Sequence, residues 1–282
     1  MSPDAIESLG TQFDDAFFII GAAILVIELL KGAFNRSLSG KSLLDMIASV
    51  STQLPYLLIE IFLMVWVYIG FVLVSETWIS WRFEFSWTLA IITLIVADFV
   101  YYWEHRFAHE VRLLWTQHAV HHSSRFMNIL VSVRFGPLET VTSALFHFPM
   151  ILIGFPAELV FASIIIVQAY QVWIHTELIG KLGPLDGVLN TPANHRVHHG
   201  CDEKYLDKNY GGILIIWDRL FGTYQREEET PRYGLARDFD SVNPLAVWFS
   251  ELPRFFNDLG QAKSASARWR IMFGRPGASP DA

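Results

Sequence analysis

Two histidine-rich stretches constrain this chain more than any other feature. The first, residues 98–122 (DFVYYWEHRFAHEVRLLWTQHAVHH), contains H-x-x-x-H followed by H-x-x-H-H, and the second, residues 194–199 (NHRVHH), repeats H-x-x-H-H. Together they hold eight of the ten histidines: His105, His109, His118, His121, His122, His195, His198 and His199. Two copies of H-x-x-H-H are expected by chance in only about one such sequence in ten thousand.

The spacing of these histidines indicates a metal site. Positions i, i+3 and i+4 lie on one face of a helix, so each motif is predicted to project its imidazoles into a single small volume. The chain has one cysteine, Cys201, which excludes an intramolecular disulfide and any cysteine-rich zinc or iron–sulfur site. Metal ligation therefore falls to histidine, with Asp, Glu or Asn as additional ligands.

The number of histidines favours two metal ions. A zinc ion is saturated by four ligands, whereas this chain offers eight, and His175, which ends an apolar stretch, is a candidate ninth. Imidazole binds iron, zinc and copper, so the ligands alone do not select the metal. Two irons beside a membrane would activate O₂ to attack a C–H bond, whereas zinc would favour hydrolysis.

The composition predicts a membrane protein. Hydrophobic residues make up 52% of the sequence and the mean hydropathy is +0.33. The polar residues 1–15 contain no Lys or Arg, so the apolar residues 16–30 are predicted to remain as an anchor. Basic residues from Lys31 to Lys41 then place the N-terminus outside and a loop of residues 31–53 in the cytoplasm. The net charge of −7 argues against a nucleic-acid partner.

Three further apolar segments complete the predicted bundle. Residues 54–74 form the second span, with Pro55 in its first turn and Glu60 either at the membrane interface or facing a substrate path. Residues 86–103 form the third span and run directly into His105. Residues 141–155 and 157–174 are predicted to form a membrane hairpin that returns the chain to the cytoplasmic side at His175.

The predicted fold is therefore an all-α integral membrane bundle of three spans plus a hairpin. A cytoplasmic cap carries the histidine-rich di-metal site. We expect one catalytic domain over residues 1–282, in which residues 16–175 hold the membrane helices and the first two histidine motifs. Residues 176–225 hold the third motif and the cap, and residues 226–282 form a C-terminal tail region.

The motifs HRFAH, HAVHHSS, NTPANHRVHHG and YLDKNYGGILIIWDRLFGTY strongly resemble the fatty acid hydroxylase / sterol desaturase superfamily of membrane di-iron oxygenases. The resemblance covers roughly residues 98–224, and WIHTE, LNTP and ETPRYGL are most similar to its alkylglycerol monooxygenase branch. It implies two iron ions held by the eight histidines, with His175 as a further ligand. It also implies a lipid substrate (an ether lipid, a fatty acyl chain or a sterol-like molecule), O₂, and a location in the bacterial inner membrane.

The resemblance leaves several points open. No electron carrier is fused to the chain, so electrons would come from a separate ferredoxin or cytochrome, or from a reduced pterin. Many family members have R-x-H-P-[LI]-E where this chain has Gly136 in place of the histidine, so an imidazole is absent at that position. The alternative function is that of a non-redox membrane metalloprotein, either a zinc hydrolase or a structural protein. Zinc could also replace iron during purification.

Residues that support metal ligands are harder to select. Asp98 lies two helical turns before His105 and is predicted either to orient a ligand imidazole or to contact a Tyr or Arg. Other candidates that would accept the second N–H of a ligand histidine are Glu139, Glu177, Asn194 and Asp218. The isolated His147 is predicted to be a core residue. We also expect an apolar channel from the bilayer to the metals, lined by residues 86–103 and 141–174, with Ala144 and Ala162 among its small positions.

Overall fold

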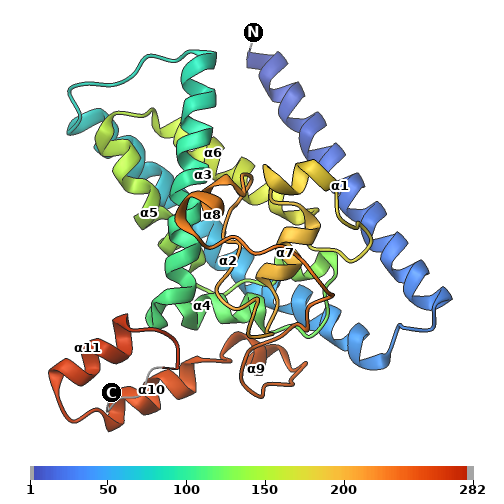
Figure 1. Ribbon diagram of the computed structural model, residues 1–282. Helices are drawn as coiled ribbons and strands as arrows, with labels where there is room; N and C mark the ends of the chain where they lie inside the picture. Colours follow the sequence, from blue (N-terminus) through green and yellow to red (C-terminus); the bar gives the residue numbers. More distant parts are fainter. Residues whose placement is uncertain (1–2, 278–282) are drawn as a thin grey trace.

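The computed structural model describes residues 3–277, which are organised as helices and connecting loops (Figure 1). The α-helices are α1 (Pro3–Phe34), α2 (Gly40–Thr77), α3 (Trp87–Glu110), α4 (Arg112–His122), α5 (Glu139–Ile153), α6 (Ala157–Val172), α7 (Pro192–His198), α8 (Ile216–Phe221), α9 (Pro244–Trp248), α10 (Leu252–Gln261) and α11 (Ala265–Phe273). Two short 3₁₀ helices are η1 (Ile129–Val133) and η2 (Gly183–Gly187). Within residues 3–277 β-pairing is limited to isolated bridges, so the all-α prediction is confirmed for that range.

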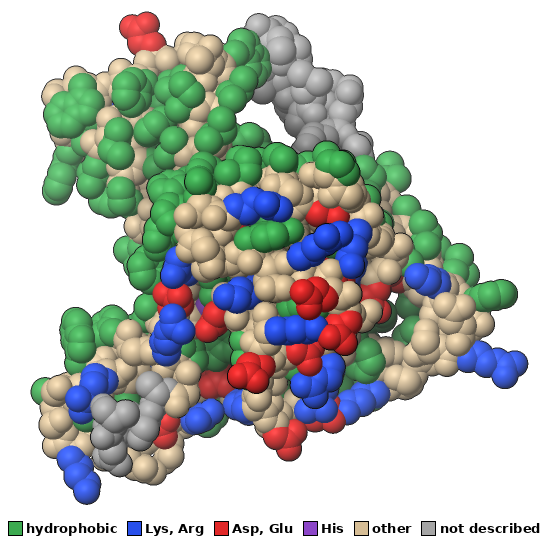
Figure 2. Space-filling view, in the orientation of Figure 1, with side chains coloured by type: hydrophobic (Ala, Val, Ile, Leu, Met, Phe, Trp, Pro, Cys, Tyr) green, Lys and Arg blue, Asp and Glu red, His purple; other side chains and the backbone are tan. Residues whose placement is uncertain are grey.

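Two helices among the described residues, α2 and α3, are long and apolar enough to cross a membrane. Large hydrophobic side chains of α2 point outward; Leu58, for example, is 77% exposed. Contiguous exposed apolar surface of this kind is typical of a membrane-facing helix rather than of a soluble protein. Figure 2 shows hydrophobic side chains covering the upper left part of the molecule, whereas charged side chains gather over its lower half.

Helix α2 starts earlier than the sequence analysis predicted. The Ser39 hydroxyl accepts a hydrogen bond from the backbone N–H of Ser42, and Ser42 Oγ accepts one from the Ser39 N–H. This reciprocal cap begins the helix at Gly40. The prediction of a loop up to about residue 53 was therefore wrong, and Pro55 lies in the interior of α2 instead of its first turn.

Helix α3 is the centre of the bundle (Figure 1). Its N-terminus is capped by the Ser86 hydroxyl, which accepts from Leu89 N–H at 3.0 Å, and it packs against α5 and α6. As predicted, it continues without a break through His105 and His109. His147 of α5 is buried against α3, with its Nε2 3.3 Å from the carbonyl oxygen of Ala97, which confirms the prediction of a core histidine.

The helices α5 and α6 meet in a tight turn at the predicted position. Gly154 has φ +105°, a left-handed conformation that favours glycine. The connection between α2 and α3 packs on this turn: Trp81 Nε1 donates to the Ile153 carbonyl at 3.2 Å, and Phe83 N–H donates to the Gly154 carbonyl at 3.0 Å. Both connections therefore stabilise the same end of the bundle.

Replacing Gly154 with valine should destabilise this end. A Cβ at Gly154 would lie 2.9 Å from the Trp81 carbonyl oxygen, and the positive φ adds strain, so we expect a loss of about 1–3 kcal/mol. Thermal unfolding of the detergent-solubilised protein would measure it. Gly70→Ala in α2 is the control, since its Cβ meets no atom within 4 Å. Equal melting temperatures for Gly154→Val and the unmodified chain would contradict the expectation.

Candidate metal centre

Nine histidines gather in the interior as two neighbouring groups. In each group the candidate ligand nitrogens all lie within 4.8 Å of one another. The five-histidine group consists of His105, His109, His118, His122 and His198. The four-histidine group consists of His121, His175, His195 and His199. The groups adjoin, because the rings of His122 and His199 stack with their centroids 4.4 Å apart.

Each H-x-x-H-H motif contributes to both groups. His118 and His122 of α4 belong to the five-histidine group, while His121 belongs to the four-histidine group. Successive residues of a helix point about 100° apart, so the adjacent His121 and His122 face different directions. The prediction that each motif projects into a single volume was wrong. The two motifs thus contribute jointly to one site.

The nitrogen atoms that converge are the Nε2 atoms. In the five-histidine group, His122 Nε2 lies 3.1 Å from His109 Nε2, 3.2 Å from His118 Nε2 and 3.1 Å from His198 Nε2. In the four-histidine group, His175 Nε2 lies 3.1, 2.8 and 3.3 Å from the Nε2 atoms of His121, His195 and His199. Each group thus surrounds one small volume with ring nitrogens.

Backbone carbonyls determine which nitrogen carries the proton. The Nδ1 atoms of His105, His175 and His198 lie 2.9, 2.7 and 3.1 Å from the carbonyl oxygens of Tyr210, Gln171 and Lys208, respectively. A carbonyl oxygen only accepts, so these Nδ1 atoms carry the hydrogen and the Nε2 lone pairs point inward. This is the tautomer that a metal ligand requires.

Burial keeps the imidazoles neutral. It lowers the pKa of His175 to about 4. Burial, assisted by neighbouring imidazoles, also holds the pKa well below its ordinary value for His121, His122, His195, His198 and His199. Neutral imidazoles whose lone pairs face one another at about 3 Å repel each other, and a shared cation removes this repulsion. The residues present therefore fit two metal ions.

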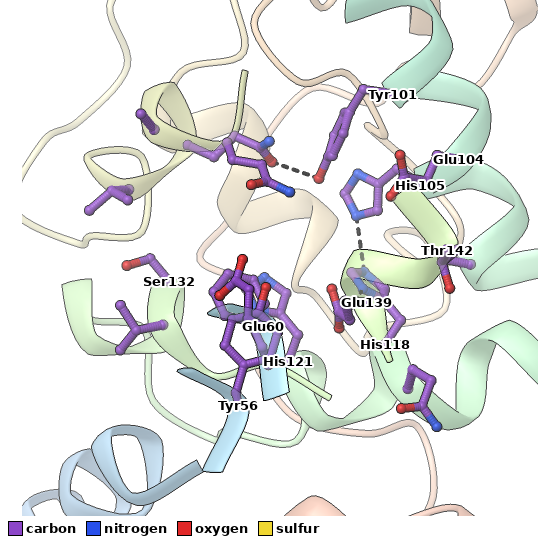
Figure 3. A pocket seen from close by; sticks show the side chains of 18 of the residues that line it. Tyr56, Glu60, Tyr101, Glu104, His105, His118, His121, Ser132, Glu139 and Thr142 are labelled. Carbon is purple, nitrogen blue, oxygen red and sulfur yellow. Dashed lines mark hydrogen bonds and ion pairs between the residues drawn. The ribbon is translucent and has the colours of Figure 1, made fainter. Parts of the chain in front are cut away.

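A cavity of about 270 Å³ opens onto both groups (Figure 3). His105 and His118 reach it from the five-histidine group, and His121 and His175 reach it from the four-histidine group. Its remaining wall comes from α2, α3, α4, η1, α5 and α6 and includes three carboxylates, which are Glu60, Glu104 and Glu139. No Lys or Arg is among its described lining residues.

A small apolar void of about 20 Å³ adjoins the cavity between helices. It shares Glu60 and Gln168 with the cavity and is otherwise lined mainly by apolar side chains: Met64, Val67, Ala144, Phe161 and Ile164. The void lies between α2 and the two helices of the predicted hairpin, and α3, which was predicted to line the channel, contributes none of its described lining residues. Ala144 lines the void, whereas Ala162 is exposed on the outer surface of α6, so its prediction as a channel residue was wrong.

Comparison with known proteins identifies this region. The model of the fatty acid hydroxylase family matches residues 90–223, which include all nine clustered histidines. Residues 90–223 are therefore similar to fatty acid hydroxylase domains. No solved structure matches the chain.

Three proteins that are similar to this chain are informative. The chain is 34% identical to alkylglycerol monooxygenase of Homo sapiens over 94% of its own length and 59% of the relative. It is 34% identical to the enzyme of the same name from Danio rerio, over 91% and 58% of the two lengths. An ornithine lipid hydroxylase of Rhizobium tropici is 37% identical over 49% of this chain and 43% of the relative. The chain spans about three fifths of the length of the two monooxygenases.

Asp98 hydrogen-bonds to a loop and makes no hydrogen bond or ion pair with an imidazole, a Tyr or an Arg of the described residues, so of the two predicted roles only an indirect one in orienting an imidazole remains. Its carboxylate accepts from the backbone N–H groups of Ile213 and Leu214 at 2.6 and 3.1 Å and from Trp217 Nε1 at 2.8 Å. Asp218 accepts from the N–H groups of the same loop at residues 210 and 211. The loop presents the Tyr210 carbonyl to His105, so Asp98 acts on the imidazole through the backbone.

The other predicted supporting residues are placed differently from one another. Glu139 Oε1 lies 3.8 Å from His118 Nδ1 and lines the cavity. Asn194 contacts no imidazole, because its Nδ2 donates to the carbonyls of residues 186 and 189. Glu177 accepts from the Tyr233 hydroxyl at 3.1 Å. Of the two interpretations of Glu60, the structure favours the one that faces a substrate path.

The sequence analysis missed Glu104, although its helical spacing from His105 and its neighbours could have indicated it. Tyr101, Glu104, His105 and Ala108 occupy positions i, i+3, i+4 and i+7 of α3, and all four line the cavity. Glu104 Oε2 is buried and has no hydrogen-bond partner among the described residues. The departure at Gly136 also has a physical reason. A Cβ there would lie 2.6 Å from the Gln117 carbonyl oxygen, so α4 leaves no room for a histidine side chain.

Substituting Asp98 with asparagine should weaken metal binding without unfolding the bundle. The new amide N–H₂ would face the three N–H groups that now donate to the carboxylate. The loop would then move, and the Tyr210 carbonyl that orients His105 would be displaced. Loss of a group that orients a ligand lowers metal affinity by roughly ten- to a hundredfold. Metal competition with a chelator would measure the change. Asp238→Asn, at a fully exposed side chain, is the control, and equal affinities in the two variants would contradict the prediction.

Proposed function

We propose that the chain is a membrane-bound di-iron monooxygenase that hydroxylates a C–H bond of a lipid. The observation that carries the proposal is the pair of adjoining histidine groups opening onto one cavity that adjoins a small apolar void. A soluble substrate would require no apolar extension between α2, α5 and α6. The names of the relatives, alkylglycerol monooxygenase and ornithine lipid hydroxylase, support a lipid substrate.

The proposed ligands are the nine clustered histidines, five for one iron and four for the other. When bound, the irons supply activation of O₂ with electrons from an external donor, which is a ferredoxin, a cytochrome or a reduced pterin. The protein's residues hold this site in place: carbonyls fix the tautomers of His105, His175 and His198, and burial excludes water from the Nε2 atoms.

The cavity wall orients the substrate. Its carboxylates and glutamines near the histidines can accept hydrogen bonds, and no Lys or Arg among its described lining residues would pair with an anionic headgroup. The apolar lining of the void between α2, α5 and α6 marks the side on which a hydrocarbon tail would lie, and the void, about 20 Å³, would have to widen to admit one. A lipid would therefore lie with its hydroxyl-bearing or amine-bearing end at the histidines. An ether lipid, a fatty acyl lipid and a sterol-like molecule are the substrate classes to compare.

The metals and the histidine roles can be tested together. Protein purified without added metal should hold about two irons per chain, and added lipid should increase O₂ uptake. His105→Ala, His121→Ala or His198→Ala should abolish turnover, because each removes a ligand from one of the groups. His147→Ala is the control and should retain most activity, since His147 belongs to neither group.

Lipid hydrolysis by a zinc-loaded chain without O₂ uptake would support the zinc hydrolase and contradict the proposal. An active alanine variant at one of the three positions would remove that histidine from the ligand set. Loss of bound metal from a folded His147→Ala variant would show that the metal site extends to α5.

Tail selection should depend on the apolar void. Ala144→Trp would fill the space beside Met64 and Phe161 and should shorten the preferred chain, because each CH₂ excluded from apolar surroundings costs about 0.8 kcal/mol. Turnover of lipids of graded chain length would show the shift at constant metal content. Ala162→Trp on the exposed side of α6 is the control. Identical chain-length profiles for the two variants would contradict the proposed tail path.

We further propose that the chain lies in the bacterial inner membrane with its N-terminus outside and its C-terminus in the cytoplasm. Lys31, Arg36 and Lys41 follow the first apolar segment, which supports this orientation. A C-terminal alkaline phosphatase fusion should be inactive, and a C-terminal fluorescent protein should be bright. An active phosphatase fusion would reverse the topology.

A further inference from the structure

The last two long elements form a separate helical hairpin, which we call the α10–α11 hairpin (residues 252–275). It has its own small core of buried side chains: Phe255, Ala262, Ala267 and Ile271. Leu259 and Met272 pack against this core. These apolar residues are thus buried between the two helices and are not available to a partner.

A second apolar surface remains exposed on the same hairpin. Phe256 and Trp269 are 62% and 63% exposed, and Phe273 is 43% exposed. The rings of Trp269 and Phe273, one helical turn apart, have centroids 4.2 Å apart. Large aromatic side chains kept in water lose the free energy that burial would provide. This surface therefore suits a partner that is apolar or amphipathic.

The hairpin is also strongly basic in an acidic chain. It contains five Lys and Arg residues and one acidic residue, Asp258, whereas the whole chain has a formal charge of −7. Four exposed cations form no ion pair with any side chain that the structure describes: Arg254, Lys263, Arg268 and Arg270. Asp258 is neutralised by Arg112. The exposed charge is thus almost entirely positive.

The position of the hairpin is fixed relative to α3. The backbone N–H of Arg112, directly after α3, donates to the Gly274 carbonyl at 2.9 Å, and Arg275 pairs with Glu110, the last residue of α3, at 3.3 Å. Figure 1 shows α10 and α11 beside the lower end of α3. In Figure 2 hydrophobic side chains of this region lie toward the apolar helices above, with Lys and Arg side chains below them.

We propose that the α10–α11 hairpin binds the bilayer surface next to the C-terminal end of α3, with preference for anionic lipid. Aromatic side chains such as Trp269 favour the boundary between headgroups and acyl chains, and cations beside them attract anionic headgroups. The contacts of Arg112 and Arg275 place both features beside the C-terminal end of α3, about two helical turns beyond its apolar segment. A protein partner would not require the exposed aromatic and basic side chains to lie beside the end of a membrane-crossing helix. The inference is independent of the iron chemistry.

The single native cysteine allows a direct measurement on the full-length chain. In a Cys201→Ser background, Ser266→Cys places a fluorescent label one turn before Trp269 and keeps every aromatic residue. The chain is reconstituted in nanodiscs of phosphatidylcholine, with or without phosphatidylglycerol, that contain spin-labelled lipid quencher. We expect the label to be quenched at least about twofold more strongly in the anionic discs.

Charge variants provide the matched comparison. Arg268→Gln/Arg270→Gln should remove the dependence on phosphatidylglycerol, whereas Lys181→Gln/Arg226→Gln, at two exposed cations elsewhere, should leave it unchanged. Equal quenching in neutral and anionic discs would overturn the preference for anionic lipid. Absence of quenching in both kinds of disc would overturn membrane contact. Cross-linking between two copies of the chain at this hairpin, with the label shielded from the lipid quencher, would also overturn it.

Discussion

The structure depends on one electrostatic constraint, which is the convergence of unprotonated imidazole nitrogens in a water-poor interior. Nine histidines cannot be buried at such distances by hydrophobic packing, because their lone pairs repel and burial disfavours protonation. Backbone carbonyls at residues 171, 208 and 210 fix three of the tautomers. The long irregular segment after α6 supplies two of these carbonyls, those of residues 208 and 210. Metal binding and folding of this segment are consequently coupled.

That coupling explains the role of the buried acids. Asp98 lies on a helix predicted to cross the membrane, yet its three hydrogen bonds reach a loop more than a hundred residues later in the chain. Asp218 holds the same loop from the other side. Two carboxylates thus convert a glycine-containing loop into a rigid support for His105. Close approach of the backbone at Gly212, where a Cβ would lie 2.7 Å from Asp98 Oδ1, is part of this arrangement.

The sequence predicted features that arise from local periodicity and composition, and it failed where contacts between distant segments decide. Histidine spacing predicted the composition of the centre, and hydropathy predicted α3 and the turn at Gly154. The early start of α2 depended on a Ser39–Ser42 cap that hydropathy does not register. The loop support by Asp98 is a long-range pairing, and the steric exclusion at Gly136 depends on α4. The division of each motif between two groups follows from helical geometry and was predictable from the sequence.

The division of His121 and His122 between the two groups constrains the distance between the two proposed metal positions. In the proposed centre, two neighbours on one backbone would serve different ions, so the inter-metal separation would be tied to covalent geometry and not to loop length. The wall proposed to bind the tail, by contrast, is built largely from α2, α5 and α6, which carry none of the nine histidines. Drift in that wall can therefore change the accepted lipid while the dinuclear spacing stays constant. One catalytic core could in this way diversify across many substrates by mutation of helices that never touch the ions.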